Sequence, residues 1–236
     1  TKRRLIQLKE ILEKKGFKTT IELREGLPYL ELEAYTKNID DAIIISGTSG
    51  KGFIKGMVLG STVNHLIKHS KLPILIIRCI PVMEEENGFV PELACSNSNY
   101  SVLFPTDFSE NSQHAFQLLL ENVVSYAQKI NLLHVQDKQV MKYRTDSDIE
   151  KFNETDKARL EELKQKILAT STLSVYTEVT SGNPTKVILD KIKENDCSLV
   201  VIGKHGRGFI EEFIVGSVTR KVLEESKTNF LIVPRP

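Results

Sequence analysis

Two stretches of this chain carry the same glycine pattern, 156 residues apart (203 − 47 = 156). Each begins as a short apolar run, opens into glycines and closes with Gly-Ser at the start of an amphipathic segment. The repeated positions are Gly47, Gly50, Gly60 and Ser61 in the first copy and Gly203, Gly206, Gly216 and Ser217 in the second. The match continues without a gap at Glu22, Gly26 and Pro28, which align with Glu178, Gly182 and Pro184. A repeat of this length indicates two copies of one domain rather than a short-period solenoid.

The order of features in each stretch predicts a phosphate-binding turn. An apolar strand leads into a glycine-rich turn that ends at a helix N-terminus, where backbone N–H groups point outward and the helix dipole adds positive potential. The glycines serve such a turn in one of two ways. Either the backbone takes a positive φ, or the absence of a Cβ lets a ligand come close. Lys204 does not stand where a P-loop needs its lysine, and no Gly-Lys-[Ser/Thr] sequence is present.

Apolar runs alternate with amphipathic segments along most of the chain. This alternation predicts an α/β fold of two tandem doubly wound domains, each a parallel sheet with helices on both faces. The predicted helices cover residues 2–15, 29–37, 61–69, about 109–127 (capped by Ser109 or Asn111), 156–169, 184–194 and 217–225. The predicted strands cover residues 18–24, 42–46, 73–79, 101–107, 131–135, 173–180, 199–202 and 230–233. The strand at 42–46 is apolar enough to be buried on both faces.

Residues 82–99 break the alternation with an acidic run and a polar stretch. We predict a solvated linker here, between a first domain at residues 1–81 and a second at residues 100–236. Thr1 aligns with Lys157, so residues 101–156 have no counterpart in the first copy, which is incomplete. Truncation of the chain or degeneration of the first domain explains this, and truncation is favoured because a sheet without its outer strands has exposed edges. Residues 136–155 are predicted to be a long mobile connection.

The charge of the chain is balanced, with 32 basic and 31 acidic residues and a formal net charge of +1. A balanced charge gives no broad field that favours nucleic acid. No apolar run approaches the roughly 20 residues of a membrane-spanning helix, and no secretory leader is visible. Cys79, Cys95 and Cys197 show no metal-ligand spacing. We therefore expect a cytoplasmic protein with reduced thiols that binds neither nucleic acid nor membrane.

The spacing Gly-x-x-Gly, nine residues, Gly-Ser resembles the nucleotide-binding motif of the universal stress protein family, and both copies carry it. The resemblance implies a parallel five-stranded sheet in each domain, of the adenine nucleotide alpha hydrolase-like kind. It also implies that the two domains pair with each other through their last strands, here Ile74–Ile77 and Phe230–Val233. The paired halves are further expected to form a homodimer.

Members of this family that bind ATP carry an Asp at the end of the first strand, and Asp107 matches that position. The resemblance places the base and ribose against Pro105, Thr106, Asp107 and Val135. It places the phosphates over Gly206, Gly216, Ser217 and Val218, with Ile202, Gly203, Lys204 and His205 in the same loop. A carboxylate can accept from ribose hydroxyls, and Ser217 can donate to phosphate. The first copy supplies only Gly47, Gly50, Gly60, Ser61 and Thr62, so we expect it to hold the phosphates alone.

Several of these residues also have plainer readings. Asp107 alone could cap the following helix, and Ser217 could be only a helix N-cap. His205 and Arg207 either contact phosphate or belong to a solvated loop. The histidines at positions 65, 69, 114 and 134 have no ligand-like spacing to Cys or carboxylates and are interpreted as surface or core residues. We predict no metal site made by the protein, although a divalent cation could accompany the phosphates.

The expected function is regulatory binding of ATP or AMP without fast catalysis. The sequence shows no nucleophile–base pair, metal cluster or catalytic carboxylate pair. Two alternatives stay open. One is an enzyme that hydrolyses ATP slowly or transfers an adenylyl group in the same crevice. The other is a ligand-free dimerisation module, against which both intact glycine motifs argue.

Overall fold

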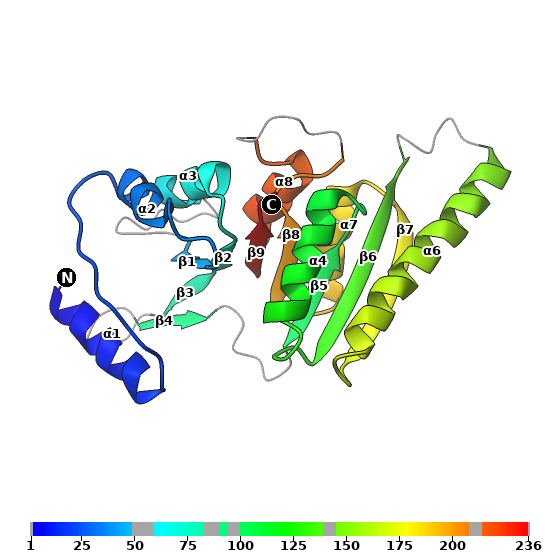
Figure 1. The fold of residues 1–236 in the computed structure, drawn as a ribbon. Coiled ribbons are helices and arrows are strands. Elements are labelled where there is room, and N and C mark those ends of the chain that lie inside the picture. Colours follow the sequence, from blue (N-terminus) through cyan, green and yellow to red (C-terminus); the bar gives the residue numbers. More distant parts are fainter. Residues whose placement is uncertain are drawn as a thin grey trace. The chain divides into compact units, whose positions relative to one another are not determined.

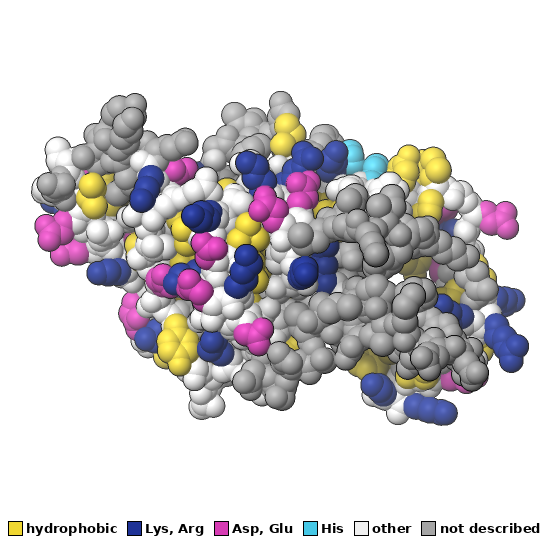
Figure 2. Space-filling view, turned by 180° about the vertical axis from the view of Figure 1, so that it is seen from behind, with side chains coloured by type: hydrophobic (Ala, Val, Ile, Leu, Met, Phe, Trp, Pro, Cys, Tyr) yellow, Lys and Arg dark blue, Asp and Glu magenta, His cyan; other side chains and the backbone are white. Residues whose placement is uncertain are grey.

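The computed structural model describes residues 2–48, 59–82, 90–93, 100–138, 145–207 and 214–235 (Figure 1). The chain forms two compact units, of which the first ends at Asn38 and the second begins at Ile39. Of the helices in these ranges, none is both long and apolar enough to cross a membrane. Figure 2 shows basic and acidic side chains interspersed on the described part of one face, in keeping with the balanced net charge.

The first unit contains two helices, α1 (Lys2–Lys14) and α2 (Pro28–Thr36), and neither has a buried residue. Both helices agree with the prediction, but the strand predicted over residues 18–24 is wrong. Its counterpart in the second copy is β7 (Ser174–Gly182), which pairs along its whole length with β6 (Lys129–Asp137). The first copy has no counterpart of β6. An alternating segment without a hydrogen-bonding neighbour does not form a strand.

The second unit is built on one seven-stranded sheet in the order β1-β2-β9-β8-β5-β6-β7. Besides β6 and β7 its strands are β1 (Ile44–Gly47), β2 (Ile74–Ile77), β5 (Ser101–Pro105), β8 (Leu199–Gly203) and β9 (Asn229–Val233). All neighbours are parallel except β2 and β9. The prediction of two tandem domains with five-stranded parallel sheets, the first incomplete, is therefore corrected to one mainly parallel seven-stranded sheet, in which five strands come from the second copy and two from the first.

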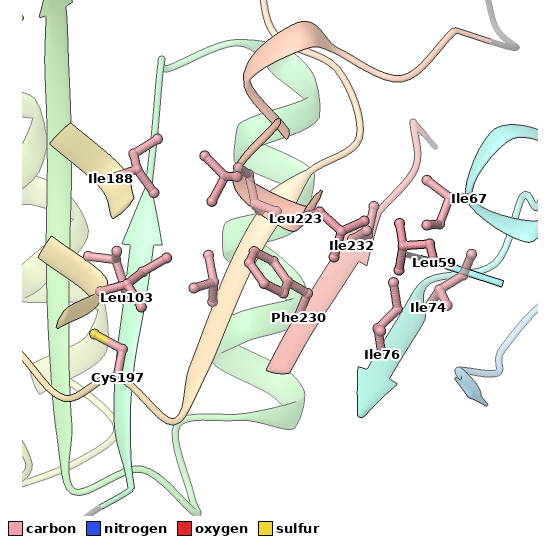
Figure 3. Packing of buried hydrophobic residues seen from close by; sticks show 14 of the residues in the cluster. Leu59, Ile67, Ile74, Ile76, Leu103, Ile188, Cys197, Leu223, Phe230 and Ile232 are labelled. Atoms are coloured by element: carbon pink, nitrogen blue, oxygen red, sulfur yellow. The ribbon is translucent and has the colours of Figure 1, made fainter. Parts of the chain in front are cut away.

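The junction between the two copies lies where β2 meets β9. The strands run antiparallel, with Ile74 opposite Ile232 and Ile76 opposite Phe230. The predicted pairing of the two terminal apolar strands is thus confirmed. Figure 3 shows the side chains of both strands packing into one cluster, together with Leu59 and Ile67 from the first copy and Leu223 from the second. Burial of apolar side chains on both sides of the junction is what joins the copies.

Helices cover both faces of the sheet. The helices are α3 (Ser61–His69), α4 (Glu110–Asn122), α6 (Asp146–Leu168), α7 (Pro184–Glu194) and α8 (Ser217–Glu225). Residues of α3, α7 and α8 pack on one face, against alternate strand residues such as Val200 and Ile232. Residues of α4 and α6 pack on the other face, against Val201 and Val233. This alternation is the doubly wound arrangement that the sequence predicts.

Two segments predicted as connections contain regular structure. Helix α6 begins at Asp146, ten residues before the predicted start at Asp156, because Thr145 and Asp148 form a capping box. At the predicted linker of residues 82–99, β4 (Val90–Leu93) pairs antiparallel with β3 (Cys79–Val82), which ends at the first linker residue, and Pro81 lies opposite Pro91. Proline is compatible with this ribbon because both of its strands are edge strands. The acidic run at residues 84–86 lies outside the described residues.

Candidate functional site

The candidate site lies at the carboxyl ends of β5, β6 and β8. β5 pairs with β6 on one side and with β8 on the other. The helix after β5, α4, packs on one face of the sheet, and the helix after the β8 loop, α8, packs on the opposite face. Ligands bind where connections diverge in this way, at a topological switch point. The strand ends bring together Pro105, Thr106, Asp107, Val135, Ile202 and Gly203.

Asp107 is half-buried, and both of its carboxylate oxygens accept hydrogen bonds. Oδ1 accepts from the N–H of Ser109 at 3.0 Å and from its hydroxyl at 2.6 Å. Oδ2 accepts from the N–H of Arg207 at 2.8 Å, across to the glycine loop. The N-cap of α4 is Ser109, whose side chain accepts from the N–H of Ser112. The interpretation of Asp107 as a helix cap is therefore wrong, since it orients the capping serine and holds the loop after β8.

The backbone turns sharply between Asp107 and Ser109. Phe108 has a φ of 59°, in the left-handed region that non-glycine residues seldom adopt. Thr106 fixes this turn through its hydroxyl oxygen, which accepts from the N–H of Phe108 at 3.0 Å and lies 2.7 Å from the hydroxyl of Ser112. A left-handed residue costs of order 1 kcal/mol, so a turn of this shape persists only where its surroundings hold it.

His134 is a buried structural residue, as predicted. Its Nδ1 lies 2.7 Å from the carbonyl oxygen of Thr106, and its Nε2 lies 3.3 Å from Oδ2 of Asp156. Gln136 donates to the same Asp156 oxygen at 2.9 Å. The side chains of His134, Gln136 and Asp156 are each more than 90% buried. This polar cluster ties the end of β6 to α6 beneath the turn that carries Asp107.

The glycine loop after β8 is held mainly through its backbone. The N–H of Lys204 donates to Val233 O at 2.7 Å, and its carbonyl accepts from Gly216 at 2.9 Å. The carbonyl of His205 accepts from Nδ2 of Asn111 at 3.0 Å. Lys204 and His205 are both buried. His205 is therefore not part of a solvated loop, while Arg207 is exposed.

Two buried cationic side chains make hydrogen bonds across the junction between the copies, one from each copy to the other. The ammonium group of Lys204 donates to the carbonyl of Lys68, near the C-terminal end of α3. The guanidinium of Arg78 donates to the carbonyl of Leu223, near the C-terminal end of α8, and burial lowers the pKa of this guanidinium. Cations suit helix C-termini because the dipole is negative there. No local sequence pattern predicts either contact, since each joins residues more than 130 positions apart.

The loop ends at the first turn of α8. Gly216 is the N-cap of this helix, so the interpretation of Ser217 as the N-cap is wrong: Ser217 is its first residue and is exposed. Arg220 is the first residue whose N–H donates to the cap carbonyl, at 2.9 Å. The N–H groups of Ser217, Val218 and Thr219 belong to the first turn, which has no intrahelical acceptors for them. A turn of this kind suits an anion.

The glycines of this loop do not serve a left-handed backbone. Among the described glycines only Gly16 and Gly26 have a positive φ. A Cβ on Gly203 would instead come within 2.5 Å of Asn111 Nδ2, and one on Gly206 within 2.8 Å of Asp107 Oδ2. Close approach is therefore the reason for glycine at both positions, and the approaching groups are side chains of this chain.

The first copy repeats the backbone geometry of the turn only in part. Gly60 is the N-cap of α3 and donates to Thr48 O at 2.9 Å, which matches the bond from Gly216 to Lys204. Ser61 and Thr62 open α3 as Ser217 and Val218 open α8. A Cβ on Gly47, however, would meet nothing within 4 Å. Gly50 lies outside the described residues.

In the ranges that the structure describes, no group of three or more His, Cys, Asp or Glu side chains is placed to hold a metal ion. The residues that sequence reasoning missed are Asn111, Ser109 and Ser112 as parts of the site. Asn111 and Ser109 were noticed only as alternative caps of α4. A cap position directly after the strand that ends in Asp107 was the available signal, because it places side chains at the same sheet edge.

Comparison with known proteins gives consistent results. The profile of the universal stress protein family matches residues 1–78 and 100–234. Universal stress protein MJ0577 of Methanocaldococcus jannaschii is 28% identical over 152 residues, covering 57% of this chain and 94% of that protein. Universal stress protein Slr1101 of Synechocystis sp. is 30% identical over 77 residues, covering 33% of this chain and 70% of that protein.

Two solved structures resemble the fold. The structure of hypothetical protein MJ0577 aligns with a TM-score of 0.52 and 27% identity, covering 58% of this chain and 96% of that one. The crystal structure of a universal stress protein from Archaeoglobus fulgidus DSM 4304 aligns with a TM-score of 0.67 and 22% identity, covering 99% of this chain and 76% of that one. The second likeness concerns the fold alone, and it extends over both copies of the repeat.

Proposed function

Because the chain belongs to the universal stress protein family, we propose that it binds an adenine nucleotide, ATP or AMP, at the carboxyl ends of β5, β6 and β8. The role we assign is regulatory, without fast catalysis. The base and ribose lie against Pro105, Thr106, Asp107 and Val135. The phosphates lie over Gly206, Gly216, Ser217 and Val218, and a divalent cation can accompany them.

One observation carries this proposal: the half-buried carboxylate of Asp107 and the open first turn of α8 flank the same glycine loop. Asp107 bonds to the N–H of Arg207 on one side of the loop. The loop is bonded to Gly216 at the start of α8 on the other. A hydrogen-bond acceptor for sugar hydroxyls thus lies on one side of the loop, and N–H donors for phosphate lie on the other. A nucleotide requires this arrangement, because its sugar donates hydrogen bonds and its phosphates accept them.

We also assign the chain two copies of the family domain, residues 1–81 and 100–236, with the first incomplete. The repeated bond geometry at Gly60 and Gly216 and the repeat in the sequence support this assignment. The first loop, with Gly47, Gly50, Gly60, Ser61 and Thr62, is assigned to the phosphates alone. Pairing of β2 with β9 takes the place of a dimer contact, and the paired halves associate further as a homodimer.

The direct test is to denature the purified protein and identify the released small molecules by mass spectrometry. Adenine nucleotide in the released fraction, or calorimetric binding of added ATP or AMP, is the expected result. A turnover assay with ATP and magnesium then separates regulation from catalysis, and a rate above about 1 s⁻¹, within the usual enzyme range, contradicts the regulatory role. A protein that is empty and also fails to bind added nucleotide overturns the proposal in favour of a dimerisation module.

A further inference from the structure

We infer that Asn111 and Asp107 are positioning residues that hold the phosphate loop in shape, and that the Gly-x-x-Gly pair is glycine because these two side chains lie against it. This inference rests on the proposed function for its consequence, but its geometry stands independently. A Cβ on Gly203 would lie 2.5 Å from Asn111 Nδ2 and one on Gly206 would lie 2.8 Å from Asp107 Oδ2, so either Cβ would force the opposing side chain to shift.

Asn111 holds the loop before Gly206. It is 2% exposed, and its Nδ2 donates to the carbonyl of His205 at 3.0 Å. In the described structure its Oδ1 has no hydrogen-bond partner, which is unfavourable for a buried amide. An apolar side chain of the same size would remove this unpaired oxygen, but it would leave the buried carbonyl of His205 without its donor. The unfavourable burial of Oδ1 is explained if the role of the Asn111 amide is to hold the glycine loop after β8.

Asp107 holds the loop after Gly206. Its Oδ2 accepts from the N–H of Arg207, while Ser109 uses Oδ1 twice. An ionised carboxylate has about four acceptor positions, so about one remains on Oδ2 for a ribose hydroxyl. The same oxygen would then bond both the sugar and the loop. Occupation of the ribose position and the shape of the phosphate loop are coupled through this one atom.

The two contacts fix the loop on either side of Gly206 before any ligand arrives. A loop that is already ordered loses less conformational entropy when it binds, and its affinity for phosphate is higher as a result. Gly47 offers the contrast, since it has no neighbour within 4 Å of its Cβ position. At this position the first copy has the glycine without a side chain lying against it.

The test compares three ligands on three variants of the full chain: ATP, inorganic tripolyphosphate and adenosine, measured by calorimetry or competition. Asn111→Leu should weaken ATP and tripolyphosphate by about tenfold each and leave adenosine unchanged. Its thermal unfolding midpoint should fall by a few degrees at most, because the carbonyl of His205 loses its donor while the unpaired Oδ1 is removed. Asp107→Ala should weaken all three ligands. Gln117→Ala, an exposed change on the same helix, should alter none.

If Asp107→Ala weakens ATP and adenosine but leaves tripolyphosphate unchanged, Asp107 is a ribose ligand only and the inference is overturned. Hydrogen exchange of the Arg207 amide in the ligand-free protein gives a readout that needs no nucleotide. Exchange should accelerate in Asp107→Ala, and unchanged exchange contradicts the inference. If the parent protein binds none of the three ligands, the proposed function fails, while the exchange measurement still tests the positioning role.

A double-mutant cycle tests the origin of the glycine. Gly206→Ala should weaken ATP or accelerate Arg207 exchange in the parent, because the new Cβ meets Asp107 Oδ2. In the Asp107→Ala background the same change should have little further effect. Equal effects in both backgrounds would mean that glycine is needed for another reason.

Discussion

Ile45 and Val201 occupy the same position of the repeat, yet Ile45 is 68% exposed and Val201 is 0% exposed. Val201 lies in a central strand and packs with residues of α4, whereas β1 is at the edge of the described sheet. The same contrast recurs in the helices, where Ile11 is 53% exposed and its counterpart Ile167 is 0% exposed. The predicted burial of residues 42–46 on both faces is therefore wrong at Ile45.

The comparison shows that a repeated sequence can reproduce a local structure without reproducing its environment. Turn and helix come from nearby residues, so α3 and α8 begin alike at Gly60 and Gly216. Burial and a complete site need elements from other parts of the sequence. The second copy has those elements, in β5, α4 and β6, and the described part of the first copy has none of them.

The largest difference between the copies should appear in nucleotide binding. In Gly216→Val the new Cβ comes within 3.3 Å of Lys204 O, and the branched side chain overpacks the turn. Overpacking costs about 1–3 kcal/mol, so ATP affinity should fall by roughly ten- to a hundredfold. Gly60→Val, the matched change, should alter calorimetric ATP affinity by less than about twofold. Equal losses would place the main site across both loops.

The next largest difference concerns stability. Val201→Ala removes two buried methyl groups and should lower the free energy of unfolding by about 2 kcal/mol. Ile45→Ala, at the matched position, should change it by less than about 0.5 kcal/mol because the side chain is already exposed. Urea titrations followed by circular dichroism measure both. A large loss from Ile45→Ala would show that another chain covers β1 in solution.

Helix capping separates the copies by a smaller amount. Asn183 is the N-cap of α7 and accepts from the N–H of Lys186, whereas its counterpart Leu27 gives α2 no side-chain cap. Asn183→Ala should destabilise the protein by about 1 kcal/mol. Leu27→Asn should stabilise α2 by about 0.5–1 kcal/mol, visible as slower amide exchange in that helix. If Leu27→Asn leaves this exchange unchanged, the cap is not what limits α2.

The smallest difference between the copies is in stability, and it comes from a group of ion pairs in the second copy whose contribution depends on pH. Lys191 lies 2.9 Å from both Glu178 and Glu194, and hydrogen bonds to these carboxylates raise its pKa above 10.5. Its stabilisation is complete below the unfolded pKa and is lost as pH rises through the higher folded pKa. Lys191→Met should cost less than about 1 kcal/mol at pH 8. The loss in free energy of unfolding caused by Lys191→Met should disappear above the folded pKa of Lys191. The effect of Tyr35→Phe, at the matched position, should not depend on that pKa.

Much of the fold could be predicted because its strands are short apolar runs between helical patterns. The pairing of β2 with β9 is an implication of the family resemblance, and the structure confirms it. The strand at residues 18–24 was mispredicted because alternation reports a face to bury and says nothing about a neighbour to pair with. The early start of α6 at Asp146 depended on a capping box inside a polar stretch, which composition alone hides.

Less of the site could be predicted. The glycine spacing and the Asp after a strand located the loop and Asp107. The partners of these residues are far away in the chain: Asn111 and His205 are 94 residues apart, and Asp107 and Arg207 are 100 apart. Only the three-dimensional arrangement identifies such contacts, because no local pattern encodes them. The sequence predicts these glycines for a ligand's close approach, whereas in the structure side chains of this chain lie against Gly203 and Gly206.

The opposed contacts of Lys204 and Arg78 have a consequence for how the sheet comes apart. Separating β2 from β9 would break both contacts at once and leave two helix ends without their cations. Separation of β2 from β9 at the junction is then all-or-none, and neither strand can separate gradually from one end. Although the sequence repeats, the seven strands should melt as a single cooperative block. A ligand bound at the glycine loop after β8, which contains Lys204, would therefore raise the melting temperature of strands from both copies together.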